Sequence, residues 1–145
     1  MKVVSLDPGT TTGVAVYNSE RDDWDRYQLG PKEHHDQLYD VLESVKPLYV
    51  VCETFTFQPR TKVVLDSVEY IGVMKLWCQH NDCRPTMQTP AQGKAFWGES
   101  KLRAVGLWLA NMPHAMDATR HLLYWWMIYQ DKRFVERLAG TRGGA

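Results

Sequence analysis

Three acidic residues and one histidine stand at positions where side chains can do chemistry. Asp7 ends an apolar, strand-like run near the start of the chain, and Glu53 ends a second such run, YVVCE. Asp117 stands at the expected start of the last helix, and His114 precedes it by three residues, on the same helical face. The ends of neighbouring strands in an α/β sheet lie side by side at its carboxyl edge, where sites are usually built. We therefore expect these four side chains to converge.

A cluster of this kind needs positive charge. Carboxylates brought together repel one another, which raises their pKa values and opposes folding unless a cation is bound. Mg²⁺ and Mn²⁺ accept carboxylate oxygens, and two such ions stabilise both the attacking and the leaving oxygen of a phosphodiester. The pattern predicts two metal ions held by four residues, which are also the predicted catalytic residues: Asp7, Glu53, His114 and Asp117. Taken singly, an Asp before Pro-Gly is typical of a turn, and an Asp at a helix start is typical of a cap.

The strands and helices that carry these residues can be predicted from hydrophobic periodicity. Strands are expected over 2–7, 13–18, 23–29, 48–53 and 84–89, and helices over 32–46, 61–80, 90–109 (in pieces, broken near Gly98) and 114–129. Three strands in a meander followed by alternation predict an α/β fold. In the helix over 61–80, the expected apolar positions include Val64, Val68, Ile71 and Leu76. We expect one domain over 1–138 and a flexible, glycine-rich tail over 139–145.

Composition limits the function classes. The chain has 145 residues with 17 basic and 17 acidic side chains, so its formal net charge is zero. Nucleic-acid binding must then rest on local basic patches rather than on overall charge. The three cysteines, an odd and sparse set, favour reduced thiols and a cytoplasmic location. No apolar run approaches the roughly 20 residues that a membrane-spanning helix needs, so no membrane partner is expected.

Three stretches of the chain carry a resemblance to a known family. SLDPGTTTGVAV, YVVCE and HAMDATRH resemble the three acidic motifs of the RuvC-type Holliday junction resolvases, within the ribonuclease H-like superfamily, and are most similar to the phage-encoded branch. The resemblance runs from residue 1 to about 130. Asp7, Glu53 and Asp117 match the family's catalytic acids. Many members have an aspartate in place of His114, and some have a histidine.

The resemblance implies both a fold and an activity. The implied fold is ribonuclease H-like, a mixed five-stranded sheet flanked by helices. The implied activity is that of a Mg²⁺- or Mn²⁺-dependent endonuclease that resolves four-way junctions and other branched DNA, acting as a homodimer that makes paired cuts. A phage-encoded protein would act in the cytoplasm of a bacterial host. The helix over 61–80, with Tyr70 and Trp77, is the expected dimer contact.

Basic and aromatic residues near the acidic motifs are the candidate DNA contacts. The expected set is Phe55, Phe57, Arg60, Lys62, Lys94 and Lys101. Lys side chains beside the site can contact phosphates, and an aromatic ring can stack on an unpaired base. RuvC-like enzymes use an aromatic residue soon after the catalytic glutamate. Phe55 or Phe57 could serve in that way, or could belong to the core.

The sequence is also compatible with several alternatives. The chain could be a non-catalytic protein that binds branched DNA with the same fold. LDPGTTTGVAV is also similar to the phosphate loop of the actin, Hsp70 and sugar-kinase ATPases, but no second Gly-Thr loop follows, and the threonines are expected to fix the hairpin instead. His121 could be a ligand or a partner of one, whereas His34 and His35 are expected at the surface. The stripe LLYWWMIYQ is expected in the core or in a dimer contact.

Overall fold

The structure of the protein, a computed structural model, describes residues 1–56, 65–131, 133 and 136. Three of the predicted DNA contacts, Phe57, Arg60 and Lys62, lie outside the described residues, as do the predicted start of the helix at 61 and the predicted tail over 139–145.

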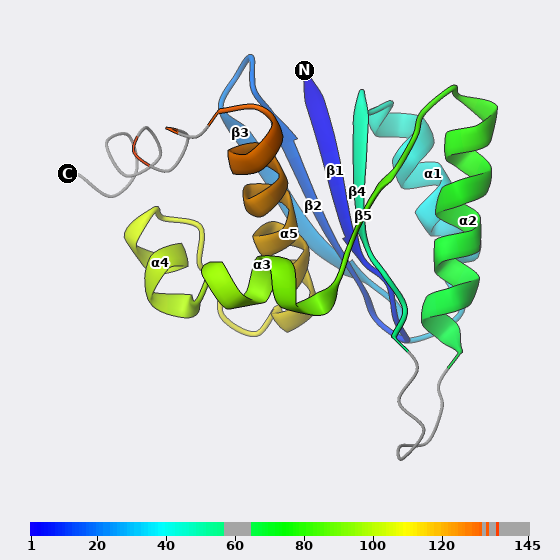
Figure 1. Cartoon of the computed structure of the whole chain (residues 1–145). Helices are drawn as coiled ribbons and strands as arrows, with labels where there is room; N and C mark the ends of the chain where they lie inside the picture. The colour runs from blue at the N-terminus through cyan, green and yellow to red at the C-terminus, as the bar shows by residue number, and fades with distance from the viewer. Residues whose placement is uncertain (57–64, 132, 134–135, 137–145) are drawn as a thin grey trace.

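A mixed five-stranded sheet forms the centre of the fold (Figure 1). Its strands are β1 (Lys2–Asp7), β2 (Thr12–Asn18), β3 (Asp23–Leu29), β4 (Tyr49–Glu53) and β5 (Thr86–Gln88). They are arranged in the order β3-β2-β1-β4-β5, with the first three antiparallel and β4 and β5 parallel to β1. The predicted meander followed by alternation is confirmed. Because β1 and β4 are parallel neighbours with Leu6 opposite Cys52, Asp7 and Glu53 end at the same edge of the sheet.

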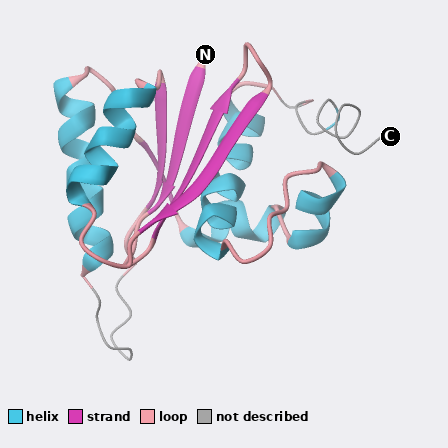
Figure 2. Ribbon diagram, turned by 180° about the vertical axis from the view of Figure 1, so that it is seen from behind, coloured by secondary structure: helices cyan, strands magenta, loops and turns pink. Residues whose placement is uncertain are grey.

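Helices cover both faces of the sheet (Figures 1 and 2). They are α1 (His35–Val45), α2 (Asp66–His80), α3 (Pro90–Phe96), α4 (Glu99–Ala104) and α5 (Pro113–Tyr129). Helices α1 and α2 pack together on one face, while α5 lies on the other with α3 against it. The predicted break near Gly98 is confirmed, since α3 ends at Phe96 and α4 begins at Glu99. None of the described helices is long and apolar enough to cross a membrane.

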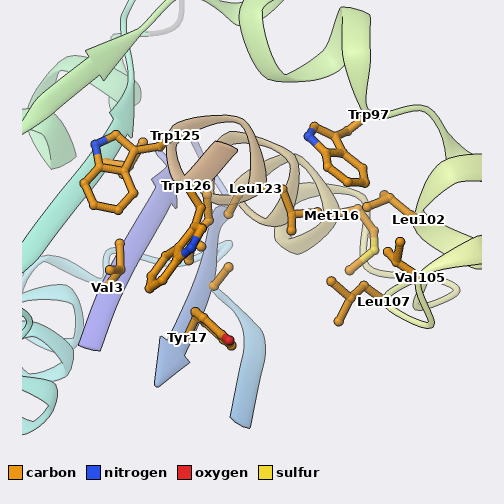
Figure 3. Close-up of a cluster of buried hydrophobic side chains, with 14 residues drawn as sticks. Val3, Tyr17, Trp97, Leu102, Val105, Leu107, Met116, Leu123, Trp125 and Trp126 are labelled. Atoms are coloured by element: carbon orange, nitrogen blue, oxygen red, sulfur yellow. The ribbon is translucent and has the colours of Figure 1, made fainter. Parts of the chain in front are cut away.

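The core on the α5 face is rich in aromatic residues (Figure 3). Tyr17 packs with its ring centroid 4.6 Å from Trp24 and 5.0 Å from Trp126. Four residues of the stripe LLYWWMIYQ are buried here, so its interpretation as core is confirmed for Leu122, Leu123, Trp125 and Trp126. Ile128 and Tyr129, near its end, are exposed. The segment carrying α3 and α4 joins the same core through buried apolar side chains: Trp97, Leu102, Val105 and Leu107. This packing fixes α3 beside α5 and close to the edge where β1 and β4 end.

The core on the α2 face uses a different side of the helix from the one that periodicity predicted. Ile71 is buried, but Val68 is 45% and Leu76 47% exposed, while Val64 lies outside the described residues. Tyr70 and Trp77, predicted as dimer contacts, are instead buried against the sheet and α1, so that prediction is wrong. The reason is that α2 carries apolar residues all round, so periodicity cannot tell which side faces the sheet.

His34 is also placed differently from its prediction. Helix α1 begins at His35 rather than near residue 32, and the loop before it turns the His34 side chain inward. The His34 ring is buried and stacks on Tyr70 at 3.8 Å, and its Nε2 lies 2.7 Å from the hydroxyl of Thr12. The expectation of a surface position is therefore wrong for His34, whereas His35 is partly exposed beside Glu69.

Candidate active site

Two carboxyl groups meet at the ends of β1 and β4. Asp7 is the last residue of β1 and is nearly buried, and the side chain of Glu53, the last residue of β4, is only 12% exposed. Burial, followed by the charge of Glu53, raises the pKa of Asp7, so the two carboxyl groups lie close enough to interact electrostatically. The predicted convergence of these two residues is present in the structure.

The start of α5 brings His114 and Asp117 to the same place. Gln28 of β3 accepts hydrogen bonds from the backbone N–H groups of His114 (3.0 Å) and Ala115 (3.3 Å), which fixes the first turn of the helix. Gly13, paired with Asp7 across β1 and β2, faces this turn, and a Cβ atom there would clash with the His114 carbonyl group. The helix backbone can therefore approach the sheet closely, and His114 Nδ1 lies 3.3 Å from Asp7 Oδ2.

Asp117 lies in the second turn of α5, because the helix begins at Pro113 and not at the predicted residue 114. Both of its carboxylate oxygens have a cationic partner. Arg120 Nη1 donates to Oδ1 at 2.7 Å, and Lys94 Nζ lies 3.3 Å from Oδ2. Arg120 also donates through Nε to the Trp97 carbonyl oxygen at 2.7 Å. Asp117 is thus held in one orientation by a side chain that is itself tied to the loop after α3.

Lys94 connects the two halves of the cluster. Its ammonium group lies 3.4 Å from Glu53 Oε2 as well as 3.3 Å from Asp117 Oδ2. It was predicted as a phosphate contact, and in the structure its partners are the carboxylates themselves. Burial lowers the pKa of Lys94, but the charges of Asp117, Glu53 and Asp7 outweigh burial and raise it above the usual value. Lys94 therefore supplies one positive charge where the sequence predicts a metal ion.

The electrostatics of the two strand ends differ. Burial, reinforced by the charges of Glu53 and Asp117, raises the pKa of Asp7 to about 8. Burial opposes ionisation of Glu53 too, but the hydrogen bond to His121 and the charge of Lys94 outweigh it and hold the Glu53 pKa below its usual range. The raised pKa of Asp7 means that the side chains present do not neutralise this carboxyl group, so added positive charge would favour its ionised form.

The donor set suits a hard divalent cation, although a cation would have to displace existing partners. Three carboxylates with one imidazole match the oxygen preference of Mg²⁺ and the mixed preference of Mn²⁺. As they stand, no three histidine, cysteine, aspartate or glutamate side chains among the described residues form a group that could hold a metal ion. Because Lys94 already lies against Glu53 and Asp117, its departure would free oxygens of both carboxylates.

Of the remaining residues predicted to contact DNA, one lies at the surface and one packs against the core. Phe55 is half-buried against the core on the α2 face, in keeping with the alternative interpretation as core. Lys101 is exposed on α4, with its ammonium group 3.7 Å from the centre of the Phe96 ring. Phe96, 39% exposed, lies two residues after Lys94 on α3 and was not among the predicted DNA contacts.

The threonine-rich turn after Asp7 serves the fold. The Thr12 hydroxyl group lies 3.3 Å from the Gly9 carbonyl oxygen and 2.7 Å from the His34 ring, and the Thr10 hydroxyl group donates to Asp66 at 2.9 Å. Ser67 donates to the carbonyl oxygen of Pro8 at 2.8 Å. These contacts tie the turn to the start of α2, as expected for threonines that fix a hairpin, and they occupy the hydroxyl groups that a phosphate loop would use.

Sequence reasoning missed several residues that hold the cluster together. Gln28 gave no signal, because its partners are backbone groups of a segment far away in the sequence. Arg120 had a local signal that was overlooked, since it follows Asp117 by three residues on the same helix. Gln88 had a signal that was overlooked, since it ends β5 and so reaches the same edge as Glu53. His121 was considered as a partner of a ligand, and the structure shows its Nε2 2.8 Å from Glu53 Oε2.

Comparisons with known proteins agree on the fold. No protein-family model and no curated protein sequence matches the chain. Among solved structures, RuvC of Thermus thermophilus in complex with a Holliday junction substrate aligns with a TM-score of 0.64 and 19% identity, covering 90% of this chain and 98% of that one. A second Thermus thermophilus RuvC structure gives a TM-score of 0.63 with 19% identity, covering 88% and 96%.

A more distant match is the yeast mitochondrial Holliday junction resolvase Ydc2, with a TM-score of 0.55 and 11% identity, covering 95% of this chain and 83% of that one. At these identities the likeness concerns the fold. The predicted fold class is confirmed: the chain has the ribonuclease H-like fold, with a mixed five-stranded sheet, that is found in the RuvC-type resolvases.

Proposed function

We propose that this protein is a metal-dependent endonuclease that resolves Holliday junctions and other branched DNA. The observation that carries the proposal is the cluster of three carboxyl groups at one edge of the sheet, in which Asp7 remains insufficiently neutralised. The same fold in proteins whose structures include a Holliday junction complex supports the choice of branched DNA as substrate. The proposed activity is that of the RuvC-type resolvases. That the protein belongs to their phage-encoded branch remains a prediction.

In this proposal Asp7, Glu53 and Asp117 hold two Mg²⁺ or Mn²⁺ ions, with His114 as the fourth ligand. The ions, when bound, would stabilise the attacking and leaving oxygens of the phosphodiester. Arg120 keeps Asp117 oriented through its 2.7 Å bond to Oδ1. Lys94, once released from Glu53 and Asp117, is free to contact a phosphate oxygen. Lys101, exposed on α4, would contact the backbone of the same DNA.

Cleavage of a labelled four-way junction tests the proposal. Wild-type protein should cut it in Mg²⁺ or Mn²⁺ and not in EDTA. Asp7→Asn should lose cleavage by about 10³-fold or more while it still binds the junction, because the amide keeps the shape and removes the charge that holds the cations. Asp40→Asn changes an exposed aspartate on α1 and should cut like wild type.

Two results would decide against the proposal. Cleavage retained by well-folded Asp7→Asn protein would reject the site. Junction binding by wild-type protein without cleavage in either metal would favour the alternative of a non-catalytic branched-DNA-binding protein. A panel that includes flaps and replication forks beside the four-way junction would then define the preferred branch.

We further propose that two copies pair through the outer surface of α2, which is made of Leu65, Val68, Gly72 and Leu76. Leu65 is 57% exposed, and Gly72 has open space in front of it. Paired cuts need two sites, and a twofold dimer of this domain would supply them. Leu76→Arg should shift the sedimentation equilibrium towards monomer at micromolar concentration, whereas Ile128→Arg, at an exposed position on α5, should not. An unchanged monomer–dimer equilibrium for Leu76→Arg would reject this surface.

A further inference from the structure

We propose that His121, held in place by Gln88, is a positioning residue that sets the orientation of the Glu53 carboxylate towards bound cations. The inference rests on the proposed function, because Glu53 is a metal ligand only within it. His121 is completely buried and Gln88 is 2% exposed, so both polar side chains are removed from solvent in a region where each needs a partner.

Three hydrogen bonds join these residues into a chain. His121 Nδ1 lies 2.6 Å from Gln88 Oε1, and His121 Nε2 lies 2.8 Å from Glu53 Oε2. Gln88 Nε2 donates to the backbone carbonyl oxygen of His121 at 3.2 Å. The chain therefore begins at the backbone of α5, passes through the end of β5 and finishes at the end of β4.

The carbonyl group at one end of this chain fixes the donor and acceptor roles of the Gln88 amide and of His121 Nδ1. A carbonyl oxygen can only accept, so the Gln88 group beside it must be the donating NH₂. The other amide atom is then the oxygen, which faces His121 Nδ1 and accepts a proton from it. With Nδ1 assigned as the donor to Gln88, Nε2 can bond the Glu53 carboxylate only as a second N–H donor, so this arrangement requires both ring nitrogens of His121 to carry a proton. The orientation of the imidazole is therefore set by the His121 backbone carbonyl group, acting through Gln88.

The elements around His121 leave its ring little freedom. His121 lies one turn after Asp117 on α5, so both face the sheet edge, and Gln88 pairs with Glu53 in the register of β4 and β5. Gly93 of α3 lies against this turn: a Cβ atom there would be 3.0 Å from His121 Nδ1. The ring is thus confined between α3, β5 and the Glu53 carboxylate.

The consequence for Glu53 is that its two oxygens are not equivalent. Oε2 is engaged by a buried ring that has little room to move, whereas the partly exposed Lys94 lies about equally far from both oxygens, at 3.4 Å from Oε2 and 3.5 Å from Oε1. A cation that replaced Lys94 would meet Oε1 already oriented. Side chains that orient metal ligands in this way typically affect metal affinity or activity by about 10- to 100-fold when they are removed.

A matched pair of substitutions separates this role from simple packing. The amide nitrogen of Gln can reach the position of His Nε2, and that of Asn the position of Nδ1. His121→Gln therefore keeps a donor to Glu53, while His121→Asn keeps a donor to Gln88 and loses the bond to Glu53. We expect Mn²⁺ affinity, measured by calorimetry on DNA-free protein, to fall about 10-fold or more in His121→Asn and by no more than about 3-fold in His121→Gln.

The kinetics of junction cleavage give a second measurement that distinguishes the two His121 variants. His121→Asn should lower kcat and leave KM for the junction unchanged, because DNA does not contact the buried ring, and His121→Gln should restore most of kcat. If His121→Asn fails to fold, as judged by its melting temperature, Gln88→Met removes the acceptor for Nδ1 without changing the ring and should weaken Mn²⁺ binding in the same direction.

The outcomes distinguish this inference from the proposed function. Equal Mn²⁺ affinities and equal kcat values for the two His121 variants would overturn the positioning role while wild-type cleavage kept the proposed function intact. Wild-type protein that binds Mn²⁺ but cuts no branched DNA would overturn the proposed function, and the calorimetric comparison would still decide on His121. Wild-type protein that binds no Mn²⁺ would overturn both.

Discussion

The ends of β1 and β4 lie side by side and each carries a carboxyl group, yet their surroundings shift the pKa values of the two groups in opposite directions. Asp7 faces a second carboxylate and a partly exposed histidine, and its pKa is raised to about 8. Glu53 faces a buried histidine and a lysine, and its pKa is lowered. The protein thus neutralises one strand end with its own side chains and leaves the other without sufficient positive charge. The difference indicates that the Asp7 end depends most on an added cation.

The largest expected effect concerns the stability of metal-free protein. Asp7 binds its proton more tightly in the folded chain than in the unfolded chain, where the pKa is about 3.9. Its contribution to stability is therefore complete below about pH 4 and is lost as the pH rises through about 8. In EDTA, the free energy of unfolding should fall by on the order of 1 kcal/mol per pH unit between pH 5 and 8. Urea titrations across this range measure the slope.

Substitutions at the two strand ends should change the stability of metal-free protein in opposite directions. Asp7→Asn should remove most of the slope and stabilise metal-free protein at pH 8, because an amide does not ionise. Glu53→Gln should destabilise it, since His121 and Lys94 lose their charged partner. The stability that Glu53 contributes is present above its unfolded pKa and disappears only in acid, so it adds no slope in the same window. Equal slopes for wild type and Asp7→Asn would contradict the account of Asp7.

A smaller effect is expected when the internal cation is removed. Lys94→Met takes the ammonium group away from Glu53 and Asp117, so a metal ion would no longer compete with it. We expect Mn²⁺ affinity to rise several-fold and metal-free protein to lose about 1 kcal/mol or less, since Lys94 is partly exposed and its ion pairs are screened by water.

Lys101→Met is the control for Lys94→Met, because Lys101 is a lysine on the neighbouring helix α4 whose ammonium group lies over the Phe96 ring. Calorimetric titration with Mn²⁺ compares the two variants with wild type. A lower Mn²⁺ affinity in Lys94→Met than in wild type would show that the lysine assists metal binding and does not compete with it.

The smallest effect is expected at His114, which lies beside Asp7. Its imidazole lies 3.3 Å from Asp7 Oδ2 and is 44% exposed in the structure. His114→Asp should favour Mg²⁺, which prefers oxygen ligands, whereas His114→Ala should lower activity a few-fold, more in Mn²⁺ than in Mg²⁺. Cleavage rates in each metal for the three proteins measure the preference. Identical metal preferences would remove His114 from the proposed ligands.

The positions of the acidic residues could be predicted because they follow from rules about strand ends. Asp7 and Glu53 end apolar runs, and parallel pairing of β1 and β4 then brings them together. Lys94 and the contact between Arg120 and Trp97 could not be assigned in the same way. Both depend on how α3 and the loop after it return over the edge of the sheet, which is decided by the packing of Trp97 and its neighbours and not by any local pattern.

Helix α2 shows the complementary difficulty. Its existence and approximate extent were predictable from its apolar content, but its rotation was not, because Val68 and Leu76 are as apolar as the buried Ile71 and Met74. Only the contacts with α1 and the sheet decide which side is covered. His34 was misplaced for a related reason: a histidine in a polar stretch reads as a surface residue, and its burial depends on the distant partners Thr12 and Tyr70.

The contact between Gly13 and the first turn of α5 has a consequence for the motions of the site. The helix and strand meet there through backbone atoms, which have no rotamers to exchange. The separation between Asp7 and the start of α5 should therefore fluctuate little on the picosecond to nanosecond timescale, even where the side chains at the rim reorient. Binding of a substrate or cation would then be accommodated by rotation of side chains such as Lys94, with the strand and helix backbones remaining a fixed frame.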